Sequence, residues 1–127
     1  MSKIEVNKLH TFLGHNDSIY TLEKIDDTRF VSAGADGMVV LWDLKSPDEG
    51  EVIAKIEGSV YALAYDVVDG FLFVGQNNEG IHKVDLNKKH EVGSIQLGNY
   101  QIFSIRQIKE TIWVGLSNGE IVILSNA

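Results

Sequence analysis

Hydrophobic and polar residues alternate along this chain in short runs, and turn-forming residues separate the runs. Typical runs are "RFVSAG", "MVVLWDL" and "TIWVGLS", each about five to eight residues long and rich in Val, Ile, Leu, Tyr or Phe. This period of two is typical of half-buried β-strands. Asp-Gly and Asn-Gly pairs between runs favour tight hairpin turns. Because no window has the ~3.6-residue spacing of an amphipathic helix, the sequence predicts an all-β protein.

The strand pattern repeats about every 40 residues along the chain. When three segments are aligned (30–44, 72–86 and 112–126), one turn position falls in register, occupied by Asp36, Asn78 and Asn118. Upstream of it, one aromatic residue per segment also falls in register: Tyr20, Tyr61 and Phe103. A period of about 40 to 45 residues with four short strands is typical of one propeller blade. We therefore expect one domain over residues 1–127 with three units, approximately 14–57, 58–97 and 98–127.

Three motifs follow one another in the first unit: Gly14-His15, Asp36-Gly37 and Trp42-Asp43. In order and spacing this unit resembles a repeat of the WD-repeat β-propeller family. The second and third units share its strand pattern, turn position and period, but they lack the closing Trp-Asp pair. The resemblance covers essentially the whole chain and implies a WD-repeat-type β-propeller segment of three four-stranded blades.

The resemblance also implies a structural tetrad in the first unit, formed by His15, Ser32, Asp36 and Trp42. In such a tetrad the Asp accepts a hydrogen bond from one His ring nitrogen. The other ring nitrogen meets the Ser hydroxyl, and the hydroxyl meets the indole N–H. The later units replace the Ser and Trp members together by aliphatic residues: Val74, Val84, Val114 and Leu124. Joint replacement avoids a stranded buried donor or acceptor, which costs about 1–3 kcal/mol, so we interpret the tetrad as a device that stabilises the blade.

The same residues raise the question of catalysis, because His15, Ser32 and Asp36 have the composition of a hydrolase triad. The resemblance implies that these side chains point toward one another inside the blade, so we expect no catalytic residues and no enzyme activity. Metal-ligand spacing is missing around the other histidines, His10, His82 and His90, and the chain has no cysteine. The acidic clusters lack calcium-loop spacing, and no glycine-rich loop leads into a helix. We therefore expect no metal and no cofactor.

The three aromatic positions in register are candidates for partner binding. In the resembled family the start of the inner strand and the adjoining turns form the face on which partner proteins dock. There, Tyr20, Tyr61 and Phe103 would act as anchors; the alternative is that they pack between blades or line the central channel. Further candidates on this face are Asn16, Asp17, Ser59, Gln76, Asn77, Asn99, Tyr100 and Ser117. These side chains suit a basic or neutral peptide better than an acidic one.

Charge and composition narrow the choice of partner and compartment. The net charge is -7, from 18 acidic and 11 basic residues, so we expect neither nucleic acid nor a membrane surface as a partner. The N-terminus has no apolar signal-peptide region, and no apolar run approaches the ~20 residues of a membrane helix. Together with the absence of cysteine, these features lead us to expect a cytoplasmic protein.

Three blades do not close a ring, since rings of the resembled family typically contain about seven. Residues 5–13 are predicted to form an outer strand that precedes the first blade, whereas no outer strand follows the last run, "EIVILS". Two copies exchanging this strand would form a six-bladed homodimer. Three copies would form a nine-bladed ring, which strains the wedge angle. Alternatively, the chain is part of a longer propeller.

Two functions from different classes remain open at the level of the sequence. The first is a non-catalytic scaffold that binds a protein or peptide and closes its ring by association. The second is a purely structural or assembly module, such as a fragment or an engineered half-propeller, whose property is self-association.

Overall fold

The computed structural model describes residues 2–125, which form eleven β-strands and no helix. The first antiparallel sheet contains β1 (Ile19–Lys24), β2 (Arg29–Gly34), β3 (Met38–Asp43) and β4 (Glu51–Lys55) in that order. The second contains β5 (Leu63–Asp66), β6 (Phe71–Gln76), β7 (Gly80–Asp85) and β8 (His90–Gln96). The third contains β9 (Ile102–Ile108), β10 (Thr111–Leu116) and β11 (Ile121–Ser125). The all-β prediction is confirmed.

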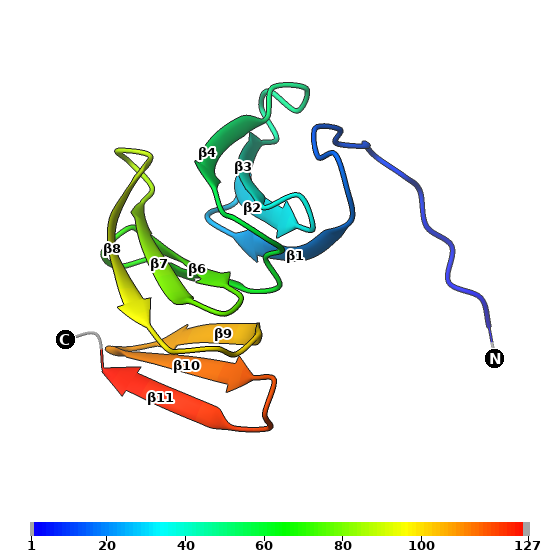
Figure 1. Cartoon of the computed structure of the whole chain (residues 1–127). Helices are drawn as coiled ribbons and strands as arrows, with labels where there is room; N and C mark the ends of the chain where they lie inside the picture. Colours follow the sequence, from blue (N-terminus) through cyan, green and yellow to red (C-terminus); the bar gives the residue numbers. More distant parts are fainter. Residues whose placement is uncertain (1, 126–127) are drawn as a thin grey trace.

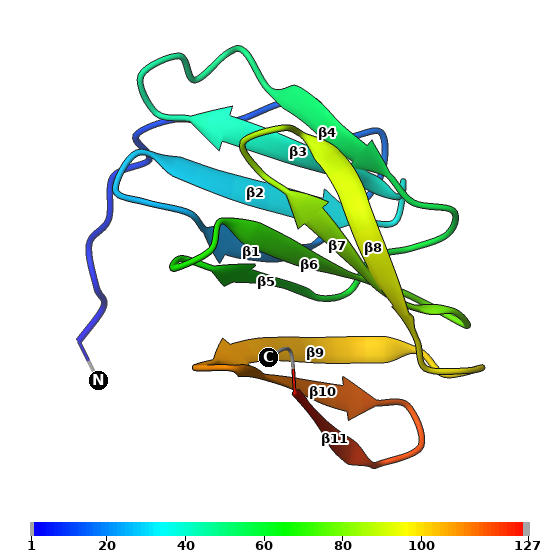
Figure 2. The same cartoon turned by 90° about the vertical axis from the view of Figure 1, so that its left-hand side faces the viewer.

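The three sheets are arranged as successive blades of an arc (Figures 1 and 2). Each blade places its first strand innermost, and these inner strands are neighbours, with β1 against β5 and β5 against β9. The arc does not close into a ring within residues 2–125. The third blade has three strands among these residues, whereas the first two have four. The unit boundaries 14–57, 58–97 and 98–127 stay a prediction, and residues 1, 126 and 127 lie outside the described part.

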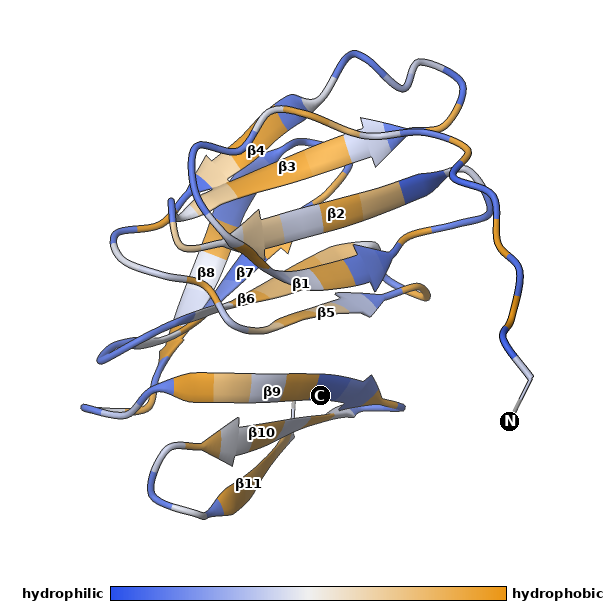
Figure 3. Ribbon diagram, turned by 90° about the vertical axis from the view of Figure 1, so that its right-hand side faces the viewer, coloured by the Kyte–Doolittle hydropathy of each residue, from blue (hydrophilic) through white to orange (hydrophobic). Residues whose placement is uncertain are grey.

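Alternation along the strands builds the core between neighbouring blades. One buried cluster joins the first two blades and includes Val31, Val39, Leu72 and Val74. A second cluster joins the next two and includes Phe73, Ile81, Ile112 and Val114. Figure 3 shows the hydrophobic residues concentrated along strands such as β2 and β3. Successive side chains of a strand point to opposite faces, so the second blade contributes Leu72 to one cluster and Phe73 to the other.

The shared turn position of the repeat is the same structural turn in all three blades. A backbone hydrogen bond closes each turn: Gly37 N–H to Gly34 O, Glu79 N–H to Gln76 O, and Gly119 N–H to Leu116 O. These bonds place Asp36, Asn78 and Asn118 at the equivalent third position of their turns. Asn78 itself adopts the left-handed backbone region, with φ of 67°, which Asn tolerates better than most residues.

The structure differs from the sequence prediction at residues 5–13. These residues form no strand, and the chain before residue 10 runs away from the blades (Figure 1). Within a single chain these residues therefore form no outer strand, and their pairing with another chain stays a prediction. The physical reason is that an isolated strand has no partner for its backbone N–H and C=O groups, and no strand of residues 2–125 pairs with this segment.

Candidate functional site

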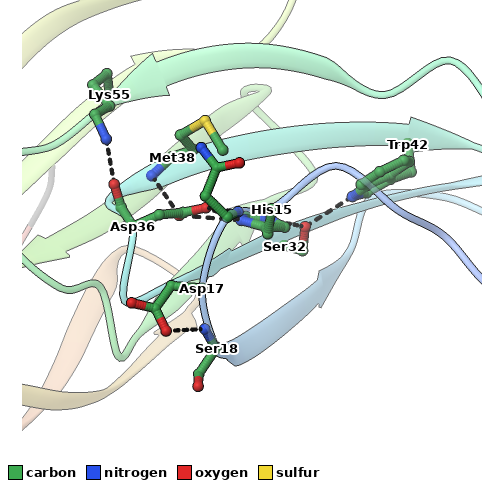
Figure 4. Close-up of polar contacts among 9 residues, drawn as sticks. His15, Asp17, Ser18, Ser32, Asp36, Met38, Trp42 and Lys55 are labelled. Atoms are coloured by element: carbon green, nitrogen blue, oxygen red, sulfur yellow. Dashed lines mark hydrogen bonds and ion pairs between the residues drawn. The ribbon is translucent and has the colours of Figure 1, made fainter.

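Four side chains of the first blade form one continuous chain of hydrogen bonds (Figure 4). His15 Nδ1 lies 3.1 Å from Asp36 Oδ1 and 3.0 Å from Oδ2. His15 Nε2 lies 2.6 Å from Ser32 Oγ, and Trp42 Nε1 donates to the same oxygen over 2.8 Å. The structure thus brings together all four tetrad residues: His15 from the loop before β1, Ser32 from β2, Asp36 from the β2–β3 turn and Trp42 from β3.

The partners of each atom define the proton positions along the tetrad. The Asp36 carboxylate only accepts, so His15 carries a proton on Nδ1. His15 Nε2 then accepts from the Ser32 hydroxyl, whose oxygen accepts from the indole N–H of Trp42. Asp36 also accepts the backbone N–H groups of Asn16 and Met38, over 2.9 and 3.0 Å. Among residues 2–125, every buried side-chain nitrogen or oxygen has a hydrogen-bond partner.

The environment of Asp36 favours its charged form. Burial raises the pKa of this carboxyl, but the backbone N–H groups of Asn16 and Met38 and the His15 ring lower it by more. The net result is that the pKa of Asp36 lies below its ordinary value of 3.8. A charged acceptor strengthens the hydrogen bonds that it receives, so Asp36 anchors the tetrad at neutral pH.

The tetrad geometry does not suit nucleophilic catalysis. Ser32 is 1 % exposed, so a substrate carbonyl has no path to its Oγ. The same oxygen is engaged by both His15 and Trp42. A Ser nucleophile instead needs an exposed oxygen beside a site that stabilises the oxyanion.

The aromatic residues in register, Tyr20, Tyr61 and Phe103, form a row across the three blades. Their ring centroids are 4.8 Å apart between Tyr20 and Tyr61 and 5.1 Å apart between Tyr61 and Phe103. Tyr20 is 48 % exposed and Phe103 is 53 % exposed. A hollow of about 320 Å³ lies along this aromatic row. The inner strands β1, β5 and β9 position the row, because the three rings lie in or just before them.

A second hollow, of about 460 Å³, shares Tyr61 with the first and is bounded by loops of the first two blades. Of the residues predicted for the docking face, Ser59, Gln76 and Asn77 line it. Asn77 Nδ2 donates to Ser59 O over 3.3 Å, and the backbone N–H of Ile102 donates to Asn77 Oδ1 over 3.1 Å. This side chain therefore fixes the connections between all three blades.

The remaining predicted face residues do not line this second hollow. Asn16 donates its backbone N–H to the tetrad, and Asp17 accepts the backbone N–H of Ser18. Tyr100 packs against the core of the last two blades, and Ser117 accepts the backbone N–H of Gln101. Asn99 lies exposed in the loop between β8 and β9.

Several residues escaped the sequence reasoning. Glu57 and Glu79 line the hollow beside Tyr61, and the polarity of their loops is the only sequence signal for them. Trp113 and Ile121 are 40 % and 74 % exposed on the third blade. The sequence does carry a signal for these two residues, because the repeat alignment places them at the positions of Phe73 and Ile81 in the second blade. No group of acidic or histidine side chains in residues 2–125 has the arrangement of a metal site.

Comparison with known proteins shows which of them share this sequence pattern and this fold. Residues 6–43 match the family model "WD domain, G-beta repeat". The chain is 32 % identical over 123 residues to WD repeat-containing protein 82 of Drosophila melanogaster. It is 30 % identical over 82 residues to TSET complex member tstF of Dictyostelium discoideum. The fold matches the WD40 β-propeller domain of Doa1 with a TM-score of 0.82 at 19 % identity, covering 90 % of this chain and 40 % of that one.

The chain belongs to the WD-repeat β-propeller family. The matched segment 6–43 contains all four tetrad residues of the first blade. The alignment with WD repeat-containing protein 82 covers 92 % of this chain but 36 % of the relative, and that with the TSET complex member covers 65 % and 7 %. This WD-repeat chain thus spans about a third of the first relative's length, and it forms an open arc of blades. None of its described residues forms a helix long and apolar enough to cross a membrane.

Proposed function

We propose that this chain is a non-catalytic scaffold that binds a protein or peptide on the aromatic row. The observation that carries the proposal is the row itself: three rings from three separate blades contact one another and stay partly exposed. Large rigid aromatic side chains with exposed faces are the commonest anchors of protein interfaces. Isolated exposed rings would need no explanation, but a contiguous row does.

The surroundings of the row support binding rather than a purely structural role. The residues that follow the rings are Thr21, Ala62 and Ser104, which are small and leave the rings accessible beside a hollow. Scaffolding is typical of WD-repeat propellers, and one relative is named as a member of a complex. We expect no enzyme activity and no cofactor, and we expect the chain to act in the cytoplasm.

Selection from a random peptide library tests this proposal without assuming the partner's chemistry. Peptides selected on the wild-type chain are measured against Tyr20→Ala, Tyr61→Ala, Phe103→Ala and the triple variant. We expect each single change to weaken binding roughly tenfold, as a lost anchor does, and the triple variant to abolish it. Val68→Ala is the control, because Val68 is an exposed hydrophobic side chain that lies outside the row. Binding that survives the triple change would refute the proposal.

The exposed face of the third blade favours a second candidate function, namely assembly. In the first two blades the positions equivalent to Trp113 and Ile121 are buried by the next blade: Val31, Val39, Phe73 and Ile81. On the third blade Trp113 and Ile121 lie on β10 and β11 with no blade beyond them in residues 2–125. An exposed apolar face of this kind is typical of an interaction surface.

We infer that a further blade covers this face, and a second copy closing a six-bladed homodimer is the simplest source. The first blade of that copy offers the exposed Leu22 and Val52 on its opposite face, and its segment 5–13, which pairs with no strand of its own chain, would add a strand beside β11. Light scattering across a concentration series tests the homodimer. Twice the 14.1 kDa chain mass supports it, provided that Trp113→Glu returns the chain to a monomer. A wild-type monomer at all concentrations refutes it and leaves the rest of a longer propeller as the covering element.

A further inference from the structure

The loops at one end of the blades carry acidic charge only. This end, the top face, consists of the loops 14–18, 35–37, 56–62, 77–79, 97–101 and 117–120. These loops contain no Lys or Arg, but they contain Asp17, Asp36, Glu57, Glu79 and Glu120. The loops at the opposite end mix both signs and include Lys45, Lys88, Lys89 and Lys109. The charge of the chain is therefore distributed unevenly, and the top face attracts cations.

Two of these acids lie at the aromatic row. Glu57 and Glu79 line the hollow that Tyr61 shares with the row. Their carboxylates have no hydrogen-bond or ion-pair partner in the described structure, whereas the carboxylates of Asp17 and Glu120 have partners. Lys55 at the end of β4, two residues before Glu57 in the sequence, does not line this hollow and donates to the backbone oxygen of Asp36. Hence the hollow holds two exposed negative charges without a compensating cation.

Aromatic rings and carboxylates together recognise organic cations. A guanidinium or ammonium group over a ring face gains about 0.5–2 kcal/mol, and a neighbouring carboxylate accepts its hydrogen bonds. Tyr61 provides such a ring between the two hollows. Arg106 lines the first hollow, along the aromatic row, but not the second hollow, which Glu57 and Glu79 line. Repulsion from Arg106 therefore favours placing an incoming cation in the second hollow.

We propose that the partner held on the aromatic row is a basic peptide segment, with an Arg or Lys side chain seated beside Tyr61 and facing Glu57 and Glu79. This inference rests on the proposed binding function of the row and names its partner class. The neighbouring amide side chains of Gln76 and Asn77 are already engaged with backbone oxygens. They shape the hollow, and the two free carboxylates supply the selectivity for positive charge.

Three labelled peptides that differ only in charge test the inference. Their sequences alternate Gly with Arg, Gln or Glu, and fluorescence anisotropy measures their affinity for the 127-residue chain. We expect the Arg peptide to bind at least roughly tenfold more tightly than the Gln peptide, and the Glu peptide not to bind. The double variant Glu57→Gln/Glu79→Gln should remove most of this preference. Binding of the Arg peptide should also weaken as salt rises, since salt screens exposed charges.

A matched double variant separates a site from general attraction by the negative chain. Glu49→Gln/Glu110→Gln removes the same charge from loops of the opposite end and should leave the Arg peptide's affinity unchanged. Equal loss in both double variants, equal binding of the Arg and Gln peptides, or no binding of any peptide overturns the inference. The library selection distinguishes this failure from failure of the proposed function. Selected peptides that need Tyr61 but carry no excess of Arg or Lys overturn the basic partner alone.

Discussion

At the scale of single residues, the tetrad shows how one blade resolves the burial of polar groups. Every buried polar atom of the four side chains has a hydrogen-bond partner. The network ends at the Asp36 carboxylate, which accepts hydrogen bonds from two backbone N–H groups. The later blades place Val74 and Val114 at the Ser position, and both are fully buried. An aliphatic core and a closed polar network are both stable solutions, whereas a partial network leaves unpaired groups at a cost.

Removal of the histidine should therefore destabilise the first blade. In His15→Ala the carboxylate of Asp36 and the hydroxyl of Ser32 lose a partner, so we expect the free energy of unfolding to fall by about 1–3 kcal/mol. Urea denaturation followed by tryptophan fluorescence measures this change. His90→Ala is the control, because His90 is exposed and should change stability little. Equal stability of wild type and His15→Ala would contradict the energetic role of the tetrad.

The lowered pKa of Asp36 predicts an acid-dependent loss of stability. Because the pKa is lower in the folded than in the unfolded chain, the ionised carboxylate stabilises the fold above the unfolded value of 3.8. This stabilisation is lost as the pH falls below that value and through the folded pKa. Asp36→Asn should thus be less stable at pH 7 but lose less of its melting temperature between about pH 7 and pH 3. Thermal melts of this variant beside Asp69→Asn test it, and parallel pH profiles of Asp36→Asn and wild type would disprove it.

At the scale of the strand, close backbone approach fixes which positions must be glycine. A Cβ atom at Gly80 would lie 1.8 Å from the backbone oxygen of Ile95 on the paired strand β8. The two strands would have to separate, because the three nearest atoms, Ile95 O, Ile95 C and Gln96 Cα, all belong to the backbone. At Gly93, on the same strand pair, a Cβ would have no neighbour within 4 Å.

We therefore expect a substitution by alanine to destabilise the protein at Gly80 but to be tolerated at Gly93. Gly80→Ala should lower the free energy of unfolding by roughly 1–3 kcal/mol, as other overpacked substitutions do. Gly93→Ala should leave it within about 0.5 kcal/mol of the wild-type value, as surface substitutions usually do. Chemical denaturation of both variants measures the difference, and similar values for the two would show that β7 and β8 are not held at this separation.

At the scale of the whole molecule, the two end blades differ from the middle one in what covers them. The second blade buries both faces, Leu72 against the first blade and Phe73 against the third. The third blade buries Ile112 on one face but leaves Trp113 exposed on the other. The stability of the arc therefore depends on what covers that face.

Association through this face should make the melting temperature depend on concentration. Binding between folded chains stabilises the folded state by mass action, so we expect the wild-type melting temperature to rise by a few degrees for each tenfold increase in concentration. Trp113→Glu should abolish the dependence, whereas Val67→Glu, at an exposed hairpin outside this face, should retain it. Calorimetry across about two decades of concentration measures the effect. A concentration-independent wild type would exclude association of copies as the covering interaction.

The sequence by itself determined the all-β class and the blade register, and its resemblance to the WD-repeat family implied the four tetrad residues. These features depend on local properties: strand periodicity, the turn preferences of Asp36, Asn78 and Asn118, and motif spacing within one blade. The tertiary structure decided what depends on neighbours distant in the chain. It brought Tyr20, Tyr61 and Phe103 into one row, left Glu57 and Glu79 unpaired beside it, and exposed Trp113 where the equivalent Phe73 is buried. It also left residues 5–13 without a strand, because strand formation needs a partner edge that the pattern of one segment does not provide.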